Sequence, residues 1–444
     1  MNTKVGVVSL GCDKNRVDTE VMLSNLAKGG YQITADPQEA DVIIVNTCAF
    51  LESARREAIQ TALEMSGYKT SGKCQKVIIT GCLGEKFGEE VFKELHEVDA
   101  VLGTQDYGNI CKVVAETLQG ERKFYHSCNN EITFGSRILT TSPHVAYLKI
   151  ADGCDNYCTY CLIPYIRGRY RSVPIDKVVA QAQDLALSGV KELILVAQDT
   201  TRYGKDLYGE YKLAELLRRL SQIEQIEWIR ILYAYPELLT DELLNEIVAN
   251  NKVVNYVDIP LQHVNDVMLR KMNRRSDGKS IRVLFDKLAR NNIAVRSTFI
   301  CGFPYETKET VDEIARFLTD YKLCNVGFFP YSREEGTAAA KFEMQVPERL
   351  KKRYVEQLYD VQYGVVCDLN AKEVGSVHKV IIDGIDASSE FDGYYYYVGR
   401  TYFMSPEIDG VVRVASKRML NVGDFCNVKI TGVIEYDLLG EVVE

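Results

Sequence analysis

Long apolar runs and an excess of positive charge are both missing from this chain of 444 residues. Polar or charged residues interrupt every hydrophobic stretch before it reaches the length of a membrane-spanning helix, so we expect no membrane partner. The first residues lack a signal-peptide charge pattern, which predicts a cytoplasmic protein. The 53 Lys and Arg are outnumbered by 62 Asp and Glu, for a net charge of −9. This balance argues against broad, nonspecific nucleic-acid binding and is compatible with a basic protein partner.

Cysteine, by contrast, is plentiful, with 13 residues. In a chain without an export signal this number argues against a disulfide framework, and it fits iron–sulfur ligation in a reducing cytosol. The length predicts about three domains, at roughly 150 residues for each.

Three cysteines, Cys154, Cys158 and Cys161, form a CxxxCxxC run, with Tyr160 before the third. Four thiolates normally fill the four iron corners of a 4Fe-4S cluster, so a run of three leaves one iron open. The amino and carboxylate groups of S-adenosylmethionine can chelate such an iron, and the run resembles that of the radical S-adenosylmethionine superfamily. The alternatives are an incidental thiol cluster or a structural zinc, but no fourth ligand for zinc follows nearby.

The first 120 residues alternate strand-like and helix-like stretches, which predicts a doubly wound parallel sheet. The expected strands are 5–11, 41–47, 76–81 and 99–103, and the expected helices are 16–27, 52–65 and 85–95. Cys12, Cys48 and Cys82 each follow a strand, where such sheets bind ligands. We therefore expect them to hold a second 4Fe-4S cluster with an open iron, with Cys74 at the opposite edge. The alternative is that these cysteines are small buried hydrophobes.

A linker over residues 121–143 is expected to lead into a core over 144–372. Six strands and the helices between them predict an open, partial (βα)6 TIM-like barrel, whose active groups lie at the carboxyl ends of its strands. The strands are expected at 144–150, 192–197, 228–233, 256–260, 294–300 and 325–330, and the helices at 176–187, 212–223, 241–249, 279–291 and 309–321. A further helix is expected at 348–372.

Other polar residues of this core leave two interpretations open. His263 could act as a general base, or it could hydrogen-bond a neighbour or the substrate, and radical chemistry needs no base. We therefore assign no catalytic acid or base. Arg167, Arg169 and Arg171 could be a solvated loop, or they could pair with a carboxylate of cofactor or substrate.

Residues 373–444 change character, and five short strands predict a small antiparallel β-barrel. They are expected at 377–383, 394–400, 410–414, 425–433 and 440–443. From Val374 onward the barrel has eleven Asp or Glu against six Lys or Arg, a net charge of −5. Such a barrel would be a poor clamp for RNA phosphates but a plausible seat for a basic protein. The acids expected to serve this role include Asp383, Asp386, Glu390 and Asp392. The alternative is that the barrel only packs on the core.

Over essentially its full length the chain resembles the methylthiotransferase family, with an N-terminal cluster domain, a radical S-adenosylmethionine core and a C-terminal TRAM domain. Within the family it is most similar to the branch that modifies an aspartate of ribosomal protein S-twelve. The matching segments are 9–16, 46–50, 153–156, 163–171, 258–263 and 406–410. One departure is Cys301, which stands where the family more often has a small aliphatic residue.

The resemblance implies sulfur insertion at an unactivated carbon. It implies that the core cluster cleaves S-adenosylmethionine to a 5′-deoxyadenosyl radical, which removes hydrogen from the aspartate β-carbon. The second cluster would carry sulfur, and a second S-adenosylmethionine would supply the methyl group. The implied partners are the ribosomal protein and a cytosolic electron donor, with no direct nucleic-acid substrate. The alternatives are a tRNA adenosine methylthiotransferase and a noncatalytic iron–sulfur sensor.

Overall fold

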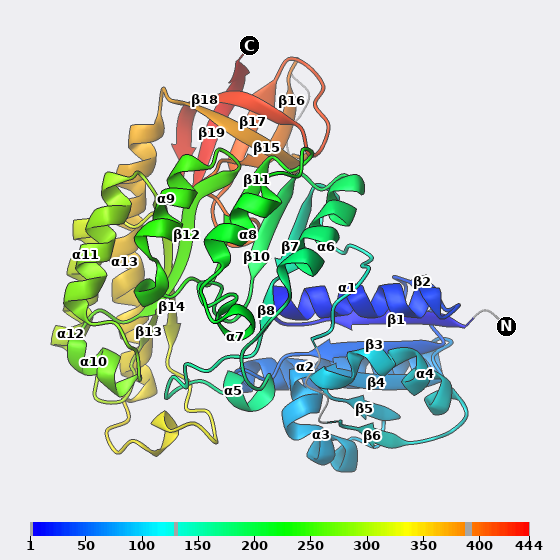
Figure 1. Ribbon diagram of the computed structural model, residues 1–444. Coiled ribbons are helices and arrows are strands. Elements are labelled where there is room, and N and C mark those ends of the chain that lie inside the picture. The colour runs from blue at the N-terminus through cyan, green and yellow to red at the C-terminus, as the bar shows by residue number, and fades with distance from the viewer. Residues whose placement is uncertain (1–2, 128–131, 387–392, 444) are drawn as a thin grey trace.

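The computed structural model describes residues 3–127, 132–386 and 393–443. Three parts follow one another along the chain: an N-terminal layer of sheet and helices, a core with a six-stranded sheet, and a small C-terminal barrel (Figure 1). The core lies between the other two parts. Among the described residues, no helix combines the length and the apolar character needed to cross a membrane.

Six parallel strands form the N-terminal sheet, in the order β2-β1-β3-β4-β5-β6. They are β1 Lys4–Ser9, β2 Gln32–Thr34, β3 Val42–Thr47, β4 Lys76–Gly81, β5 Ala100–Leu102 and β6 Lys123–Tyr125. The four predicted strands are confirmed, and the two additional ones are three-residue strands at the sheet edges. Strand β3 is buried at every position, as its continuous apolar run requires when helices cover both faces of a parallel sheet.

Four helices cover this sheet: α1 Asp13–Lys28, α2 Glu52–Ser71, α3 Cys82–Glu94 and α4 Ile110–Leu118. Helices α1 and α4 pack their apolar side chains on one face. Helices α2 and α3 pack on the other. The doubly wound arrangement is the one predicted from the sequence, although α4 was not anticipated.

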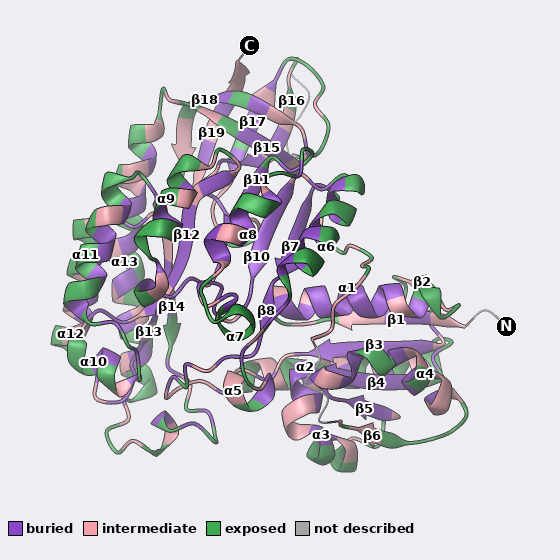
Figure 2. Ribbon diagram, in the orientation of Figure 1, coloured by how far each residue is buried: buried purple, intermediate pink, exposed green. Residues whose placement is uncertain are grey.

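The core is an open sheet of six parallel strands in the order β14-β13-β12-β11-β10-β7. They are β7 Val145–Lys149, β10 Glu192–Val196, β11 Trp228–Ile231, β12 Val253–Gln262, β13 Ala294–Cys301 and β14 Asn325–Pro330. The helices around them are α6 Ile175–Leu187, α8 Leu213–Leu220, α9 Asp241–Ala249, α11 Gly278–Arg290, α12 Lys308–Tyr321 and α13 Glu348–Glu373. Strands β7, β10 and β11 are buried throughout, the edge strand β14 is only partly buried, and the outer helix faces are exposed (Figure 2). This confirms the partial (βα)6 barrel.

Five strands close the C-terminal barrel in the order β15-β16-β17-β19-β18. They are β15 Val377–Ile385, β16 Tyr395–Arg400, β17 Val412–Ser416, β18 Phe425–Ile434 and β19 Asp437–Val443. The barrel is antiparallel as predicted except where β17 pairs with β19, which run parallel. Closure leaves no free sheet edge in this part.

The concave face of the core sheet is filled by the other two parts of the chain. Trp228 and Tyr256 of the sheet share one apolar cluster with Val17 of α1 and with Tyr402 and Phe403, which follow β16. Since an open barrel would otherwise expose this apolar surface, the core depends on both neighbours for its burial.

A buried ion-pair network joins the core to the barrel. Glu192 accepts from Arg230 at 2.8 Å and from Arg400 at 2.8 Å, and all three side chains are at most 2% exposed. Burial would raise the pKa of Glu192, but Arg400 and Arg230 hold it below its ordinary value. The carboxylate is therefore ionised and shared between two parts of the chain.

Several acids of the barrel that were expected to face a basic partner have ion-pair partners inside the molecule, and a docking role for the barrel stays a prediction. Asp383 pairs with Arg400 at 2.6 Å and with His144 at 2.8 Å. Asp386 pairs with Arg413 at 3.2 Å. Glu390 and Asp392 lie outside the described residues. A formal charge count could not show that most of the described acids already have cationic partners.

The segment between the N-terminal sheet and the core packs against α1 where it is described. Arg137 donates to Glu20 at 2.5 Å, with both side chains at most 1% exposed. The backbone N–H of Thr140 donates to the other oxygen of Glu20 at 2.8 Å. The buried acid of α1 thus fixes the path of this expected linker.

Candidate metal centres

The CxxxCxxC loop begins just after the carboxyl end of β7. Two short strands, β8 Ala151–Asp152 and β9 Arg171–Ser172, flank the loop in sequence and pair with each other. Gly153 has φ +80°, and a Cβ there would lie 2.0 Å from the carbonyl oxygen of Arg169, so only glycine fits before Cys154. Farther on, the N–H of Thr159 donates to the carbonyl of Met272, which follows α10 Asp266–Lys271. The loop is therefore fixed at several points.

The thiols of this loop lie close enough to influence one another electrostatically. Burial raises the pKa of Cys154 to about 12, and the neighbouring Cys158 adds to the rise. Burial likewise raises the pKa of Cys161, again with Cys158 as the next contribution. Both groups are neutral thiols in the metal-free protein, so binding of iron would release protons.

The second set of thiols converges at the carboxyl edge of the N-terminal sheet, as predicted. Cys12 is the N-cap of α1, Cys48 follows β3, and Cys82 begins α3. Burial raises the pKa of Cys82 to about 12, with Cys12 and Cys48 among the neighbours that raise it further. Cys74 lies elsewhere, where its thiol donates to the carbonyl of Lys76 at 3.3 Å.

A glycine with positive φ precedes each of two of these cysteines, Cys12 and Cys82. Gly11 has φ +96°, and a Cβ there would lie 2.9 Å from the Cβ of Cys48. Gly81 has φ +95°, and its Cβ would lie 2.4 Å from the carbonyl oxygen of Thr47. Glycine at these two positions lets neighbouring strand ends pack closely.

Each triad has one buried arginine that donates toward a sulfur. Arg167 approaches the Sγ of Cys82 at 3.6 Å, and Arg274 approaches the Sγ of Cys158 at 3.8 Å. Of the three arginines predicted as a cluster, Arg167 is buried, Arg169 is exposed, and Arg171 donates to the carbonyl of Arg167. Arg274, which also stacks on Tyr235 at 4.2 Å, was not singled out.

His263 has a structural role in this fold. Its Nδ1 accepts from the backbone N–H groups of Val264 and Asn265, at 2.8 and 2.9 Å. Its Nε2 therefore carries the proton and donates to Glu306 at 3.0 Å. The ring is fully buried and both nitrogens are engaged, which favours the hydrogen-bonding interpretation over the general base.

A largely apolar cavity of about 350 Å³ is lined by residues from the N-terminal part and from the core. Phe50 and Leu51, just after Cys48, form one wall, and Tyr160, next to Cys161, belongs to another. The remaining wall comes from the carboxyl ends of core strands, with Phe329 and Tyr331 among its residues. One chamber is thus lined by residues adjacent in sequence to both sets of thiols.

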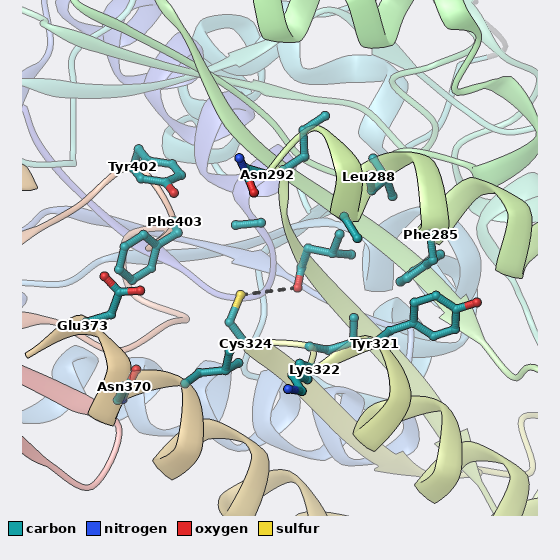
Figure 3. A pocket seen from close by; sticks show the side chains of 16 residues that line it. Phe285, Leu288, Asn292, Tyr321, Lys322, Cys324, Asn370, Glu373, Tyr402 and Phe403 are labelled. Carbon is teal, nitrogen blue, oxygen red and sulfur yellow. Dashed lines mark hydrogen bonds between the residues drawn. The ribbon is translucent and has the colours of Figure 1, made fainter. Parts of the chain in front are cut away.

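Another cavity, of about 250 Å³, lies at the opposite ends of β13 and β14 (Figure 3). Leu288 and Phe285 of α11 line one side, and Phe403 and Glu373 line the other. Cys324 lies within it and donates to the carbonyl of Val295 at 3.6 Å. Residues of the core and two residues that follow β16 line this cavity, and none of the predicted cluster ligands does.

Three of the segments that carried the family resemblance meet in space. Arg16, in segment 9–16, pairs with Glu407, in segment 406–410, at 2.8 Å. Asp409 pairs with Arg296 at 3.4 Å, and Arg296 also pairs with Asp258 of segment 258–263 at 3.1 Å. These residues join all three parts of the protein around the concave face of the core.

Both triads fit an iron–sulfur group by their chemistry. Each offers three clustered thiols and one buried N–H donor directed at sulfur, and thiolates with hydrogen-bonded sulfurs are what such groups require. Within the described part of the chain, no three His, Cys, Asp or Glu side chains are grouped closely enough for a single metal ion. A four-iron cluster is larger than one ion, so the thiols that hold it lie farther apart than the ligands of a single metal ion.

Comparison with known proteins agrees with the three-part architecture. The model of the Uncharacterized protein family UPF0004 matches residues 4–103, that of the Radical SAM superfamily matches 148–318, and that of the TRAM domain matches 374–443. In fold, the chain is similar to the radical S-adenosylmethionine methyltransferase TsrM from Kitasatospora setae, with a TM-score of 0.55 and 12% identity over 74% of this chain and 73% of that one. Fold and thiol loop define a protein of the radical S-adenosylmethionine class.

Full-length relatives narrow the class to one family. The chain is 47% identical over 446 residues to the ribosomal protein uS12 methylthiotransferase RimO of Clostridium kluyveri, and 48% identical over 444 residues to that of Clostridium botulinum. In each case the match covers 99% of this chain and 98% of the relative. The chain belongs to the family of ribosomal protein uS12 methylthiotransferases.

Proposed function

We propose that this protein adds a methylthio group to the β-carbon of an aspartate in ribosomal protein uS12. The observation that carries the proposal is the pair of thiol triads beside one cavity, in a chain that matches uS12 methylthiotransferases along its whole length. Sulfur insertion requires one carbon to meet both centres, and the walls of this cavity come from the chain near Cys48 and next to Cys161. The division of the chain into an N-terminal domain (1–120), a linker (121–143), a core (144–372) and a barrel (373–444) remains a prediction.

The cofactors are two 4Fe-4S clusters and S-adenosylmethionine. Cys154, Cys158 and Cys161 would hold one cluster, and Cys12, Cys48 and Cys82 the other. When bound, these groups supply reductive cleavage of S-adenosylmethionine at the first site and sulfur for transfer at the second. With three thiols in each set, one iron at each site stays open to a ligand that is not protein.

The protein itself supplies position and shielding. Phe50 and Leu51 on one side of the cavity and Phe329 and Tyr331 on the other present apolar surface, which would keep water from a reactive carbon. Glu334, at the cavity rim, is held by Arg55 at 2.6 Å, so the N-terminal part and the core are tied together beside the opening. The Arg55–Glu334 ion pair thus joins the two parts of the chain that line this cavity.

Iron content gives a direct prediction for the ligands. Anaerobically reconstituted protein should bind about eight irons, four for each cluster. Replacing Cys154, Cys158 and Cys161 together by Ala should leave about four, and so should replacing Cys12, Cys48 and Cys82. Cys74→Ala, at the opposite sheet edge, is the matched control and should retain all eight. Full iron after either triple replacement would exclude that triad as ligands.

Mass spectrometry of ribosomal proteins and of bulk tRNA, from cells with and without this gene, tests the proposed substrate. Aspartate of uS12 should carry the methylthio group only where the gene is present. Complementation with the unsubstituted gene should restore the modification, and a gene lacking Cys154, Cys158 and Cys161 should not. If uS12 is unmodified and a tRNA adenosine changes instead, the assignment moves to the tRNA enzymes.

A further inference from the structure

Arg167 lies at the junction of the N-terminal part and the core, and its side chain is only 3% exposed. One nitrogen donates to Asp18 at 2.7 Å and approaches Asp152 at 3.3 Å. The other donates to the side-chain oxygen of Asn15 and approaches the Sγ of Cys82 at 3.6 Å. A residue that follows the core's thiol loop therefore reaches across to a thiol of the other triad.

The charges around Arg167 balance without the thiol. Asp18 also accepts from Lys149, which approaches Asp152 at 3.6 Å, so two cations face two carboxylates, all at most 8% exposed. The two carboxylates accept from the same guanidinium nitrogen and fix the plane of the guanidinium.

With the guanidinium fixed in this way, the N–H directed at Cys82 is not needed to satisfy a charge. It is available to the sulfur. The arrangement recurs at the other triad, where Arg274 is stacked on Tyr235, donates to the carbonyl of Pro260 at 2.9 Å, and directs its other nitrogen toward Cys158. Two unrelated loops place one buried arginine beside one thiol of each triad.

We propose that Arg167 is a positioning residue that donates a hydrogen bond to the Cys82 thiolate and thereby raises the reduction potential of the N-terminal cluster. The inference rests on the proposed function, because it assumes iron at Cys12, Cys48 and Cys82. Reduction adds negative charge that spreads onto the ligating sulfurs, and an N–H donor stabilises that charge. Loss of the donor should therefore make the cluster harder to reduce.

The test uses the full-length chain with Cys154, Cys158 and Cys161 replaced by Ala, so that only the N-terminal cluster forms. Arg167→Met, Arg167→Lys and the control Arg169→Met are introduced, reconstituted anaerobically and titrated with reductant under electron paramagnetic resonance. The midpoint potential should be lowest in Arg167→Met. It should be intermediate in Arg167→Lys, which keeps the charge but loses the planar fork. It should be unchanged in Arg169→Met, whose side chain is exposed.

A merely structural clamp would destabilise the protein without moving the potential, so about four irons at an unaltered potential in Arg167→Met overturns the inference. A second measurement does not depend on how well that variant folds. In the same background labelled with [15N]arginine, pulsed resonance of the reduced cluster should show coupling to one 15N, lost in Arg167→Lys and kept in Arg169→Met. Absence of the coupling before substitution also overturns the inference. Absence of iron from this background would instead overturn the proposed function.

Discussion

A chain in which Cys12, Cys48 and Cys82 are all replaced by Ala should still cleave S-adenosylmethionine to 5′-deoxyadenosine but should transfer no methylthio group to uS12. The expected loss of transfer is complete, because the replaced thiols are the proposed holders of the sulfur donor. Cleavage should survive because Cys154, Cys158 and Cys161 lie on a separate loop of the core, fixed by its own contacts. Anaerobic incubation with dithionite, followed by chromatography of the nucleoside and mass spectrometry of uS12, measures both outcomes.

The reciprocal variant completes the comparison. Replacing Cys154, Cys158 and Cys161 should abolish both cleavage and transfer, because transfer depends on the radical that cleavage provides. Cys74→Ala should retain both. Methylthio transfer by the N-terminal variant would show that its triad does not deliver the sulfur. Failure of unsubstituted, iron-loaded protein to form 5′-deoxyadenosine would favour the noncatalytic sensor.

Glu192→Gln should destabilise the protein by about 3–5 kcal/mol, because it removes the carboxylate partner of the buried Arg230 and leaves Arg400 with Asp383 alone. A glutamine keeps one acceptor but turns an N–H group toward a guanidinium that is itself only a donor. The substitution should weaken the contact between barrel and core, because Arg400 belongs to β16 of the barrel and Arg230 to β11 of the core. Urea unfolding followed by tryptophan fluorescence suits the measurement, because Trp228 lies on that interface.

Glu242→Gln is the matched control for this substitution. Glu242 pairs with Arg218 at 2.8 Å on the surface, with side chains 66% and 48% exposed. Its loss should cost at most about 1 kcal/mol. Equal unfolding midpoints for the two variants would show that the Glu192 network contributes little to holding the barrel on the core.

Strand and helix positions could be predicted well where burial imposes a pattern along the sequence. The fully buried β3, with its apolar run at residues 42–45, and the six core strands were expected because parallel strands between helices must be hydrophobic on both faces. Edge strands β2 and β6 have only three residues each, which is too short for such a pattern. The parallel pairing of β17 with β19 depends on how the barrel closes, which no local signal records.

The placement of the thiols could also be predicted, because the carboxyl ends of parallel strands meet at one edge. The partners of those thiols could not. Arg167 and Arg169 have the same residue type and similar neighbours in sequence, yet one is buried against Asp18 and the other is exposed. Likewise, Asp383 counted as surface charge until its contacts with Arg400 and His144 were known. Partners distant in sequence decide whether a charged side chain faces solvent.

The way in which Tyr402 and Phe403 lie against Trp228 and Tyr256 also has a consequence for synthesis on the ribosome. The apolar inner face of the core sheet is complete once residue 330 has emerged, but its cover comes from about seventy residues later in the chain. A nascent chain of that length would present a wide hydrophobic surface to other proteins. The part of the cover that Tyr402 and Phe403 provide therefore becomes available only after the whole sheet has been synthesised.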